Sequence, residues 1–339
     1  MVTPFFFLLK AKMRAEKEML MRNGKRNSSS LGDIEKQLQL MHKYVTFGED
    51  SLIKKRLSYT GFFRLRLYAR FLLSKSSILR KKPSQEMLFS LYDFDEQMRI
   101  LLFVYCKKAE IQLKTNISGA CTEYEGSPFF YLSESSYTPS KSNNDKLTRH
   151  RNIKMFDGFL RELFILESKI RTDTSKYPEI RDMRPVGKSK KDRLPAGVIF
   201  SYLDMGDLCR IYSYLRGDLR KQVLRYSYTR KNYGKETTKQ FDTWLDAVRT
   251  LRNSCAHHNM LAGKHSCVIL PEFGEGTLLV SDTDLFSRLY ALKKILPEEM
   301  SFRLSADIDS LISKTPLDIY RLGLLPVDWK TRFEKIRPL

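Results

Sequence analysis

The sequence lacks the long apolar runs and Gly-rich loops that mark several large classes of protein. Its one N-terminal apolar run, Pro4 to Leu9, is far shorter than the ~20 residues that cross a bilayer. No basic stretch precedes this run and no small-residue cleavage site follows it, which argues against a secretory signal. Gly-rich phosphate-binding patterns are also missing. We therefore expect neither a membrane protein nor a nucleotide-binding fold of the phosphate-loop kind.

Paired cysteines are missing as well. The five cysteines form no CxxC pair and have no spacing typical of a metal site. An odd number of cysteines without such spacing is typical of reduced thiols in the cytosol, so we expect a cytoplasmic protein without metal or cofactor. These cysteines are Cys106, Cys121, Cys209, Cys255 and Cys267.

Acidic residues are few relative to basic ones. The 339 residues include 60 Lys and Arg against 39 Asp and Glu, a formal net charge of +21. A surplus of this size repels itself unless an anionic partner relieves it. Nucleic acid is the commonest such partner and an anionic membrane surface is the second. A protein that is merely basic is the third interpretation, and charge alone does not exclude it.

Apolar residues recur at steps of three and four along most of the chain, as they do on one face of a helix. The clearest stripe covers about 26 residues from Leu91 to Ile117, and another runs from Phe241 to Cys255. Asp33 is the expected N-cap of the first helix. Short β-like runs near residues 267–270 and 277–280 leave room for one small β-hairpin. We predict an all-α helical bundle with additional N- and C-terminal helices.

Changes of texture divide the chain into three parts. A polar stretch without apolar period ends the N-terminal lead-in, and the helical pattern weakens after His258. A basic, Pro-containing segment interrupts the middle part. The predicted parts are a flexible lead-in at 1–30, a helical domain at 31–262 with a basic loop at 171–195, and a mostly helical extension at 263–339.

The most informative segment is Thr250 to His258, which closes a strongly amphipathic helix. It contains Arg252 and His257, separated by four residues. Histidine titrates near neutral pH and can move a proton to or from the 2′-hydroxyl or 5′-oxygen of RNA. Arginine offers a fixed fork of donors to phosphate oxygens, whose charge grows in the transition state. Because the 2′-hydroxyl is an internal nucleophile, such a site needs no metal.

The spacing alone has a simpler explanation. In an Arg-rich chain with five His, an Arg four to six positions before a His is expected by chance about once. Cationic side chains are also favoured at the C-terminal end of a helix. The Arg–His pair can therefore be a structural helix end in a non-catalytic RNA-binding protein. An adaptor that works through protein contacts alone is a further alternative.

Four segments in order are similar to the boxes of a known family. Leu251 to His258 resembles the "L-R-N-x-C-A-H-H" signature of AbiD/AbiF-type abortive-infection proteins, which belong to the HEPN superfamily of helical ribonucleases. Four residues depart from the family pattern: Lys114 replaces an arginine, Gly61 replaces an asparagine, and Phe62 and Phe63 replace two tyrosines. The other boxes are Tyr59–Tyr68, similar to "NYYRL-x-x-Y"; Leu91–Arg99 with Ala109–Ile111, similar to "LYxFDxxLR…IEI"; and Val198–Leu208, similar to "SFGxLS".

The resemblance, which covers roughly residues 35 to 262, implies a HEPN-type bundle and a metal-independent endoribonuclease toxin of an anti-phage system. It implies that Arg252 and His257 are catalytic and that Asn253 and His258 orient or assist them. It also implies a homodimer that juxtaposes two motifs, and a structured small RNA as partner. Glu110 lies one turn before Lys114, so we expect an i,i+4 ion pair between them. A second prediction is that both residues support the catalytic site.

Two regions interleave basic and aromatic residues, a texture that suits RNA because bases stack on aromatic faces while cations hold phosphates. For individual aromatics such as Phe62, Phe63, Tyr212 and Tyr214 we favour a place in the core. For the basic residues we favour RNA. The predicted RNA-binding residues are Arg64, Arg66, Arg70, Lys81 and Lys82 in the first region and Arg216, Arg220, Lys221, Arg225, Arg230 and Lys231 in the second.

Overall fold

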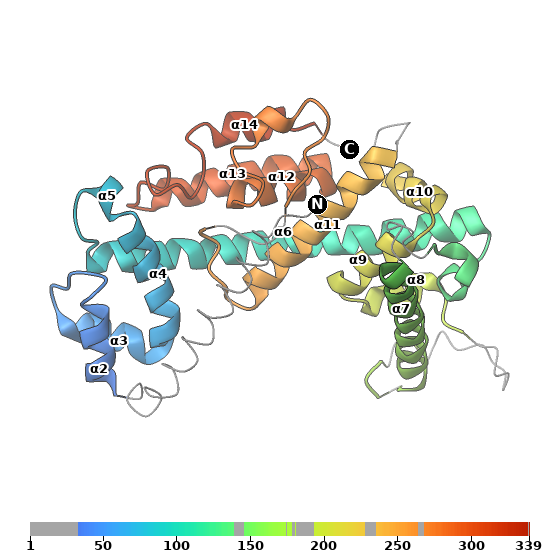
Figure 1. Ribbon diagram of the computed structural model, residues 1–339, viewed down its shortest axis with the longest axis horizontal. Helices are drawn as coiled ribbons and strands as arrows, with labels where there is room; N and C mark the ends of the chain where they lie inside the picture. The colour runs from blue at the N-terminus through green and yellow to red at the C-terminus, as the bar shows by residue number, and fades with distance from the viewer. Residues whose placement is uncertain are drawn as a thin grey trace. The chain divides into compact units, whose positions relative to one another are not determined.

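The computed structural model describes residues 33–138, 146–173, 175–177, 180, 193–227, 235–263, 268–337 and 339. Throughout these residues the chain is α-helical with short 3₁₀ turns and no β-strand, which confirms the all-α prediction (Figure 1). None of the described helices is apolar over a length that could cross a bilayer. The chain divides into two compact units. Of the described residues, unit 1 comprises those from 33 to 94 and from 316 to 322, and unit 2 comprises the others.

Unit 1 is a cluster of short helices. Asp33 caps the first of them by accepting a 3.0 Å hydrogen bond from the Glu35 amide, as its sequence position predicts. Gly61, with φ +83°, separates the next two helices. Buried apolar residues on all but the shortest of these helices form the core of the unit. The elements are α2 (Ile34–Met41), α3 (Asp50–Thr60), α4 (Phe62–Ser74), α5 (Ser76–Leu79) and the first ten residues of α6 (Gln85–Glu125).

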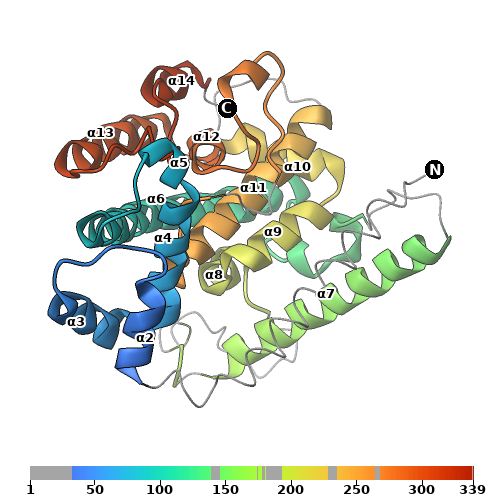
Figure 2. The same cartoon turned by 60° about the vertical axis from the view of Figure 1, so that its left-hand side comes forward.

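Unit 2 is built around the rest of α6 and around α11 (Lys235–Ala256), which packs against both α9 and α12 (Figure 2). The predicted stripe of α11 is its buried face, in which the Trp244 indole N–H donates to the Leu270 carbonyl at 2.8 Å. The other helices are α7 (Lys146–Thr172), α8 (Ala196–Tyr202), α9 (Met205–Tyr214), α10 (Gly217–Ser227), α12 (Leu285–Ile295), α13 (Glu298–Lys314) and α14 (Trp329–Lys335). The 3₁₀ turns are η1 (Phe130–Leu132), η2 (Glu134–Ser136) and η4 (Gly276–Leu278).

Helix α6 is longer than its apolar stripe predicts, because it continues through Gly119 to Glu125 and spans 41 residues. A Cβ atom at position 119 would lie 2.5 Å from the Tyr226 hydroxyl oxygen. The glycine therefore allows α10 to approach α6 closely, which offsets its weak helix propensity.

The expected β-hairpin is wrong for the described part of its span, residues 268–270 and 277–280. That part contains no strand, and Gly276–Leu278 forms a 3₁₀ turn instead. The physical reason lies in the buried carboxylates of Glu272 and Glu275, which hold the Lys294 ammonium of α12 at 2.5 and 2.9 Å. The segment satisfies its charges against a helix rather than by pairing two strands.

Gly61 provides a test of the break between α3 and α4. We expect Gly61→Ala to lower the free energy of unfolding by about 1–3 kcal/mol, since φ +83° is strained for alanine. A Cβ atom would meet no other atom within 4 Å there, so the loss would come from the backbone. Gly48→Ala is the matched control, because its Cβ also meets nothing and its φ is not positive. Urea titrations that give equal changes for the two variants would contradict this account.

Candidate active site

The motif helix α11 ends in a turn that exposes both histidines. The Asn259 amide donates to the Ser254 carbonyl at 2.8 Å and the His258 amide donates to Cys255 at 3.3 Å. These two bonds, with His258 at φ +56°, form a Schellman motif in which histidine takes the left-handed position that usually favours glycine. His257 and His258 are exposed, and among the described residues neither imidazole has a hydrogen-bond partner.

Arg252 points to a different environment. Its side chain is 24% exposed, and its Nε lies 3.6 Å from Oε2 of Glu110, which is 2% exposed. The guanidinium also donates from Nη1 to Oδ1 of Asn253 at 3.1 Å and lies 5.9 Å from the centre of the Phe103 ring. The arginine is thus held from one side while a quarter of its surface faces solvent.

Glu110 is the centre of this arrangement. Its Oε1 lies 2.9 Å from Nζ of Lys107 and 3.2 Å from Nζ of Lys114. Lys114 also donates to the Ser201 carbonyl of α8 at 3.1 Å. The structure therefore contains the i,i+4 pair that the sequence predicts, and brings Glu110, Lys114 and Arg252 together. A catalytic role for the motif stays a prediction.

A second buried carboxylate, which the sequence analysis did not select, anchors the chain just after the motif. Asp95 is 4% exposed and accepts a 2.9 Å hydrogen bond from the Leu261 amide. It also pairs with the guanidinium of Arg99, which is 2% exposed. Both residues lie in the family-like box Leu91–Arg99, so their charges within an apolar stripe were the signal that could have identified them.

The sulfur atoms behind the motif are poor nucleophiles. Burial raises the pKa of the Cys255 thiol to about 12 and that of Cys106 well above its ordinary value, so both stay protonated at neutral pH. Burial also lowers the pKa of Arg288 on α12 to about 10. The four cysteines of the described residues are free thiols. Within the same residues, no group of three or more His, Cys, Asp or Glu is arranged to hold a metal ion.

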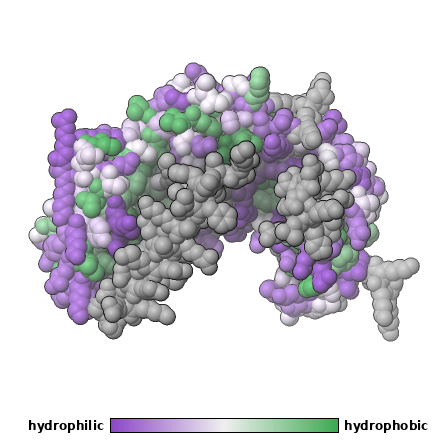
Figure 3. Space-filling view, viewed as in Figure 1, coloured by the Kyte–Doolittle hydropathy of each residue, from purple (hydrophilic) through white to green (hydrophobic). Residues whose placement is uncertain are grey.

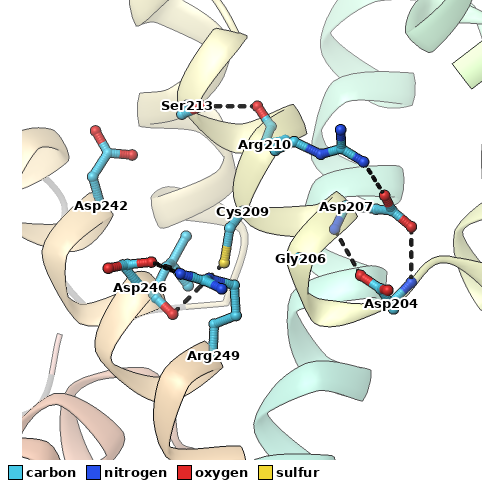
Figure 4. Close-up of a pocket in the computed structure, with 10 residues that line it drawn as sticks. Asp204, Gly206, Asp207, Cys209, Arg210, Ser213, Asp242, Asp246 and Arg249 are labelled. Atoms are coloured by element: carbon cyan, nitrogen blue, oxygen red, sulfur yellow. Dashed lines mark hydrogen bonds and ion pairs between the residues drawn. The ribbon is translucent and has the colours of Figure 1, made fainter. Parts of the chain in front are cut away.

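A groove of about 510 Å³ lies between α9 and α11, before the motif (Figure 4). Four aspartates and two arginines line it, and each arginine has a carboxylate partner: Arg210 pairs with Asp207 at 2.7 Å and Arg249 with Asp246 at 2.5 Å. Asp204 and Asp207 form the capping box of α9. None of the predicted catalytic residues lines this groove, so we assign it no role in the site. Its lining is Asp204, Gly206, Asp207, Cys209, Arg210, Ser213, Asp242, Leu245, Asp246 and Arg249.

The two predicted RNA-binding regions differ in how their cations are used. In the second region, in unit 2, Arg216 pairs with Glu125 and Asp218, and Arg220 pairs with Asp242. Lys221 is half-buried and Arg225 is exposed, whereas Arg230 and Lys231 lie outside the described residues.

The first region lies in unit 1. Arg70, Lys81 and Lys82 are exposed there, and Arg64 is half-buried. Arg66 donates to the Tyr44 hydroxyl at 2.9 Å, and Lys82 donates to the His42 carbonyl at 2.6 Å.

Comparison with known protein families gives a match. The family described as "Abi-like protein" matches residues 55–262, from the middle of α3 to the residue after the Asp95-bonded Leu261. The matched span includes the motif Arg252–His258 and the Glu110 cluster. No curated protein and no solved structure matches the chain.

Asp95 provides a test of how the segment after the motif is anchored. We expect Asp95→Ala to lower the free energy of unfolding by about 3–5 kcal/mol, because it leaves the buried Arg99 without this carboxylate. Asp309→Ala removes the carboxylate of an exposed pair with Lys330 and should leave stability nearly unchanged. The measurement is chemical denaturation of both variants and the parent. A loss as small for Asp95→Ala as for the control would refute the anchoring role.

Proposed function

The chain belongs to the Abi-like protein family, and on that premise we propose that it is a HEPN-type, metal-independent endoribonuclease toxin. Membership of the family indicates a role in abortive infection, the defence in which an infected cell stops phage growth. One observation supports the chemical part of the proposal more than any other. The buried Glu110 holds Arg252 at the end of α11, where the following turn exposes His257 and His258.

In the proposed reaction Arg252 binds the non-bridging oxygens of the scissile phosphate and stabilises the charge that grows on them. The ribose 2′-oxygen attacks phosphorus while its proton passes to a base. The bond from phosphorus to the 5′-oxygen breaks, and that oxygen takes a proton from an acid. His257 supplies one of these two transfers. The products are a 2′,3′-cyclic phosphate and a free 5′-hydroxyl.

Asn253 and His258 have supporting roles in this proposal. The Asn253 side-chain oxygen accepts a hydrogen bond from Arg252 and so fixes the plane of the guanidinium. His258 occupies a left-handed position where glycine would fit with less strain. A histidine that adopts this strained backbone supports a functional end of the helix over a purely structural one.

A homodimer would complete the site, because one chain supplies one motif. The surface of α6 beside Glu110 supports this arrangement. Ile100, Val104 and Ile111 are 57%, 48% and 59% exposed, and their spacing of four and seven residues places them on one face of the helix. An exposed apolar strip on a folded protein favours a partner surface. We propose a second copy as this partner, and a structured small RNA as the ligand that restrains the toxin.

The catalytic proposal is tested with purified chain and total RNA. Arg252→Ala and His257→Ala should each lower cleavage by at least about 100-fold, the usual effect of a lost acid–base or charge-stabilising group. Parent activity should persist in EDTA, and its products should end in 2′,3′-cyclic phosphate. Lys335→Ala, an exposed cation at the end of α14, is the control and should cleave normally. Normal cleavage by a folded His257→Ala variant, or 3′-hydroxyl products, would exclude the proposed chemistry.

The dimer is tested by light scattering after nuclease treatment. The parent should have about twice the 39.8 kDa mass of one chain. Ile100→Glu combined with Val104→Glu should give the single-chain mass and lose cleavage, because two charges cannot be buried in an apolar contact. Ile165→Glu, at a residue 61% exposed on α7, is the matched control and should remain dimeric. A monomeric parent that still cleaves RNA would rule out the paired site.

A further inference from the structure

Unit 1 carries an unusual surface on α3, α4 and the chain that follows them. Residues 59–82 contain seven Lys and Arg and no Asp or Glu. In the same segment Tyr59, Phe63 and Leu67 are 65%, 64% and 53% exposed. On the face of unit 1 drawn in Figure 3, hydrophobic residues lie among hydrophilic ones. Large apolar side chains exposed within a field of one sign of charge mark a surface built for a partner.

The Tyr59 ring is exposed, yet it is held in place. Its hydroxyl accepts a 2.9 Å hydrogen bond from Nη1 of Arg56. Arg56 in turn pairs with Asp93, and its guanidinium lies 5.2 Å from the Phe89 ring centre and 5.0 Å from that of Tyr92. The ring is therefore ordered before any ligand arrives, which lowers the entropy that binding would cost.

Phe63 is the second exposed ring. It lies two residues after Gly61, and its ring lies 5.6 Å from that of the buried Phe62 in an edge-to-face contact. Helix α4 buries Phe62, Leu65 and Tyr68 on its other side, so the position of Phe63 is fixed by the core of the unit.

Three cations of the segment 59–82 are free to bind phosphates. Arg64, Arg70 and Lys81 have no acidic partner among the described residues, and the last two are exposed. In contrast, Arg216 and Arg220 of the other predicted region are both paired with carboxylates. An arginine that already has a carboxylate partner gains little from a phosphate, so the two regions are not equivalent.

We propose that unit 1 binds single-stranded RNA, with unpaired bases stacked on Tyr59 and Phe63 and phosphates held by Arg64, Arg70 and Lys81. The choice of RNA as partner rests on the proposed function. The choice of binding residues and the preference for single strands rest on the exposed rings and unpaired cations instead. An aromatic face can stack on a base only where the base is unpaired, and every base offers such a face. The surface therefore captures RNA with little preference for sequence.

The binding experiment uses the full chain with His257→Ala, so that the RNA is not consumed. The probe is a ~12-nucleotide single strand, within the usual site size of stacking surfaces, that carries 2-aminopurine. Its fluorescence should be quenched on binding. Phe63→Leu and Tyr59→Leu should each weaken binding about tenfold and reduce the quenching, whereas Tyr59→Phe, which keeps the ring, should bind within about twofold of the parent.

Charge is tested separately from stacking. Arg70→Gln should flatten the slope of log affinity against log salt by about 0.7, the value for one phosphate contact on a single strand. Phe63→Leu should leave that slope unchanged. Lys314→Gln, at an exposed lysine on α13, is the control and should change neither affinity nor slope.

Three outcomes would overturn the proposal. The first is parent-like binding by both leucine variants. The second is equal competition by duplex RNA. The third is that Phe63→Leu loses binding to anionic phospholipid vesicles but keeps binding to RNA. That result would assign the surface to a membrane. If the chain binds as expected but the parent never cleaves RNA, the binding surface stands and the ribonuclease proposal falls.

Discussion

The arrangement of the motif depends on one buried carboxylate. Glu110 is 2% exposed, and a carboxylate removed from water must be compensated or it destabilises the fold. Lys107 and Lys114 compensate it on α6, and Arg252 reaches it from α11. The distance of 3.6 Å between Nε of Arg252 and the carboxylate is longer than a hydrogen bond. The attraction thus holds the arginine near α6 without a hydrogen bond to this carboxylate.

Pairing with carboxylates also separates the cations that stabilise the fold from those that can bind an anionic partner. In unit 2 Lys294 is fully buried between Glu272 and Glu275, and Arg216 pairs with Glu125 and Asp218. These cations contribute to the net charge of +21 but not to an anion-binding surface. The segment 59–82 of unit 1 has no acidic residues of its own and keeps much of its charge unpaired. Net charge therefore indicates an anionic partner, and only the pairing of each cation indicates where that partner binds.

Helical periodicity predicted the elements well because burial follows it closely. The stripe of α11 is buried as expected, and so are Phe62 and Tyr212. The general expectation that aromatics belong to the core fails at Phe63, one position after Phe62, because adjacent residues of a helix point about 100° apart. The left-handed backbone of His258 and the contact of Asp95 with Leu261 could not be predicted, since both depend on how α11 ends against α6. The hairpin prediction failed for a related reason: the segment between its two β-like runs carries Glu272 and Glu275, whose partner Lys294 lies on a helix beyond both runs.

The exposure of the motif has a consequence for regulation if the chain is the proposed ribonuclease. Charge stabilisation by Arg252 is strongest where water is excluded, and in a single chain His257 and His258 face solvent. A second copy seated on Ile100, Val104 and Ile111 would cover this region with apolar surface and lower its dielectric constant. Activity would then rise with assembly rather than with a change inside the fold.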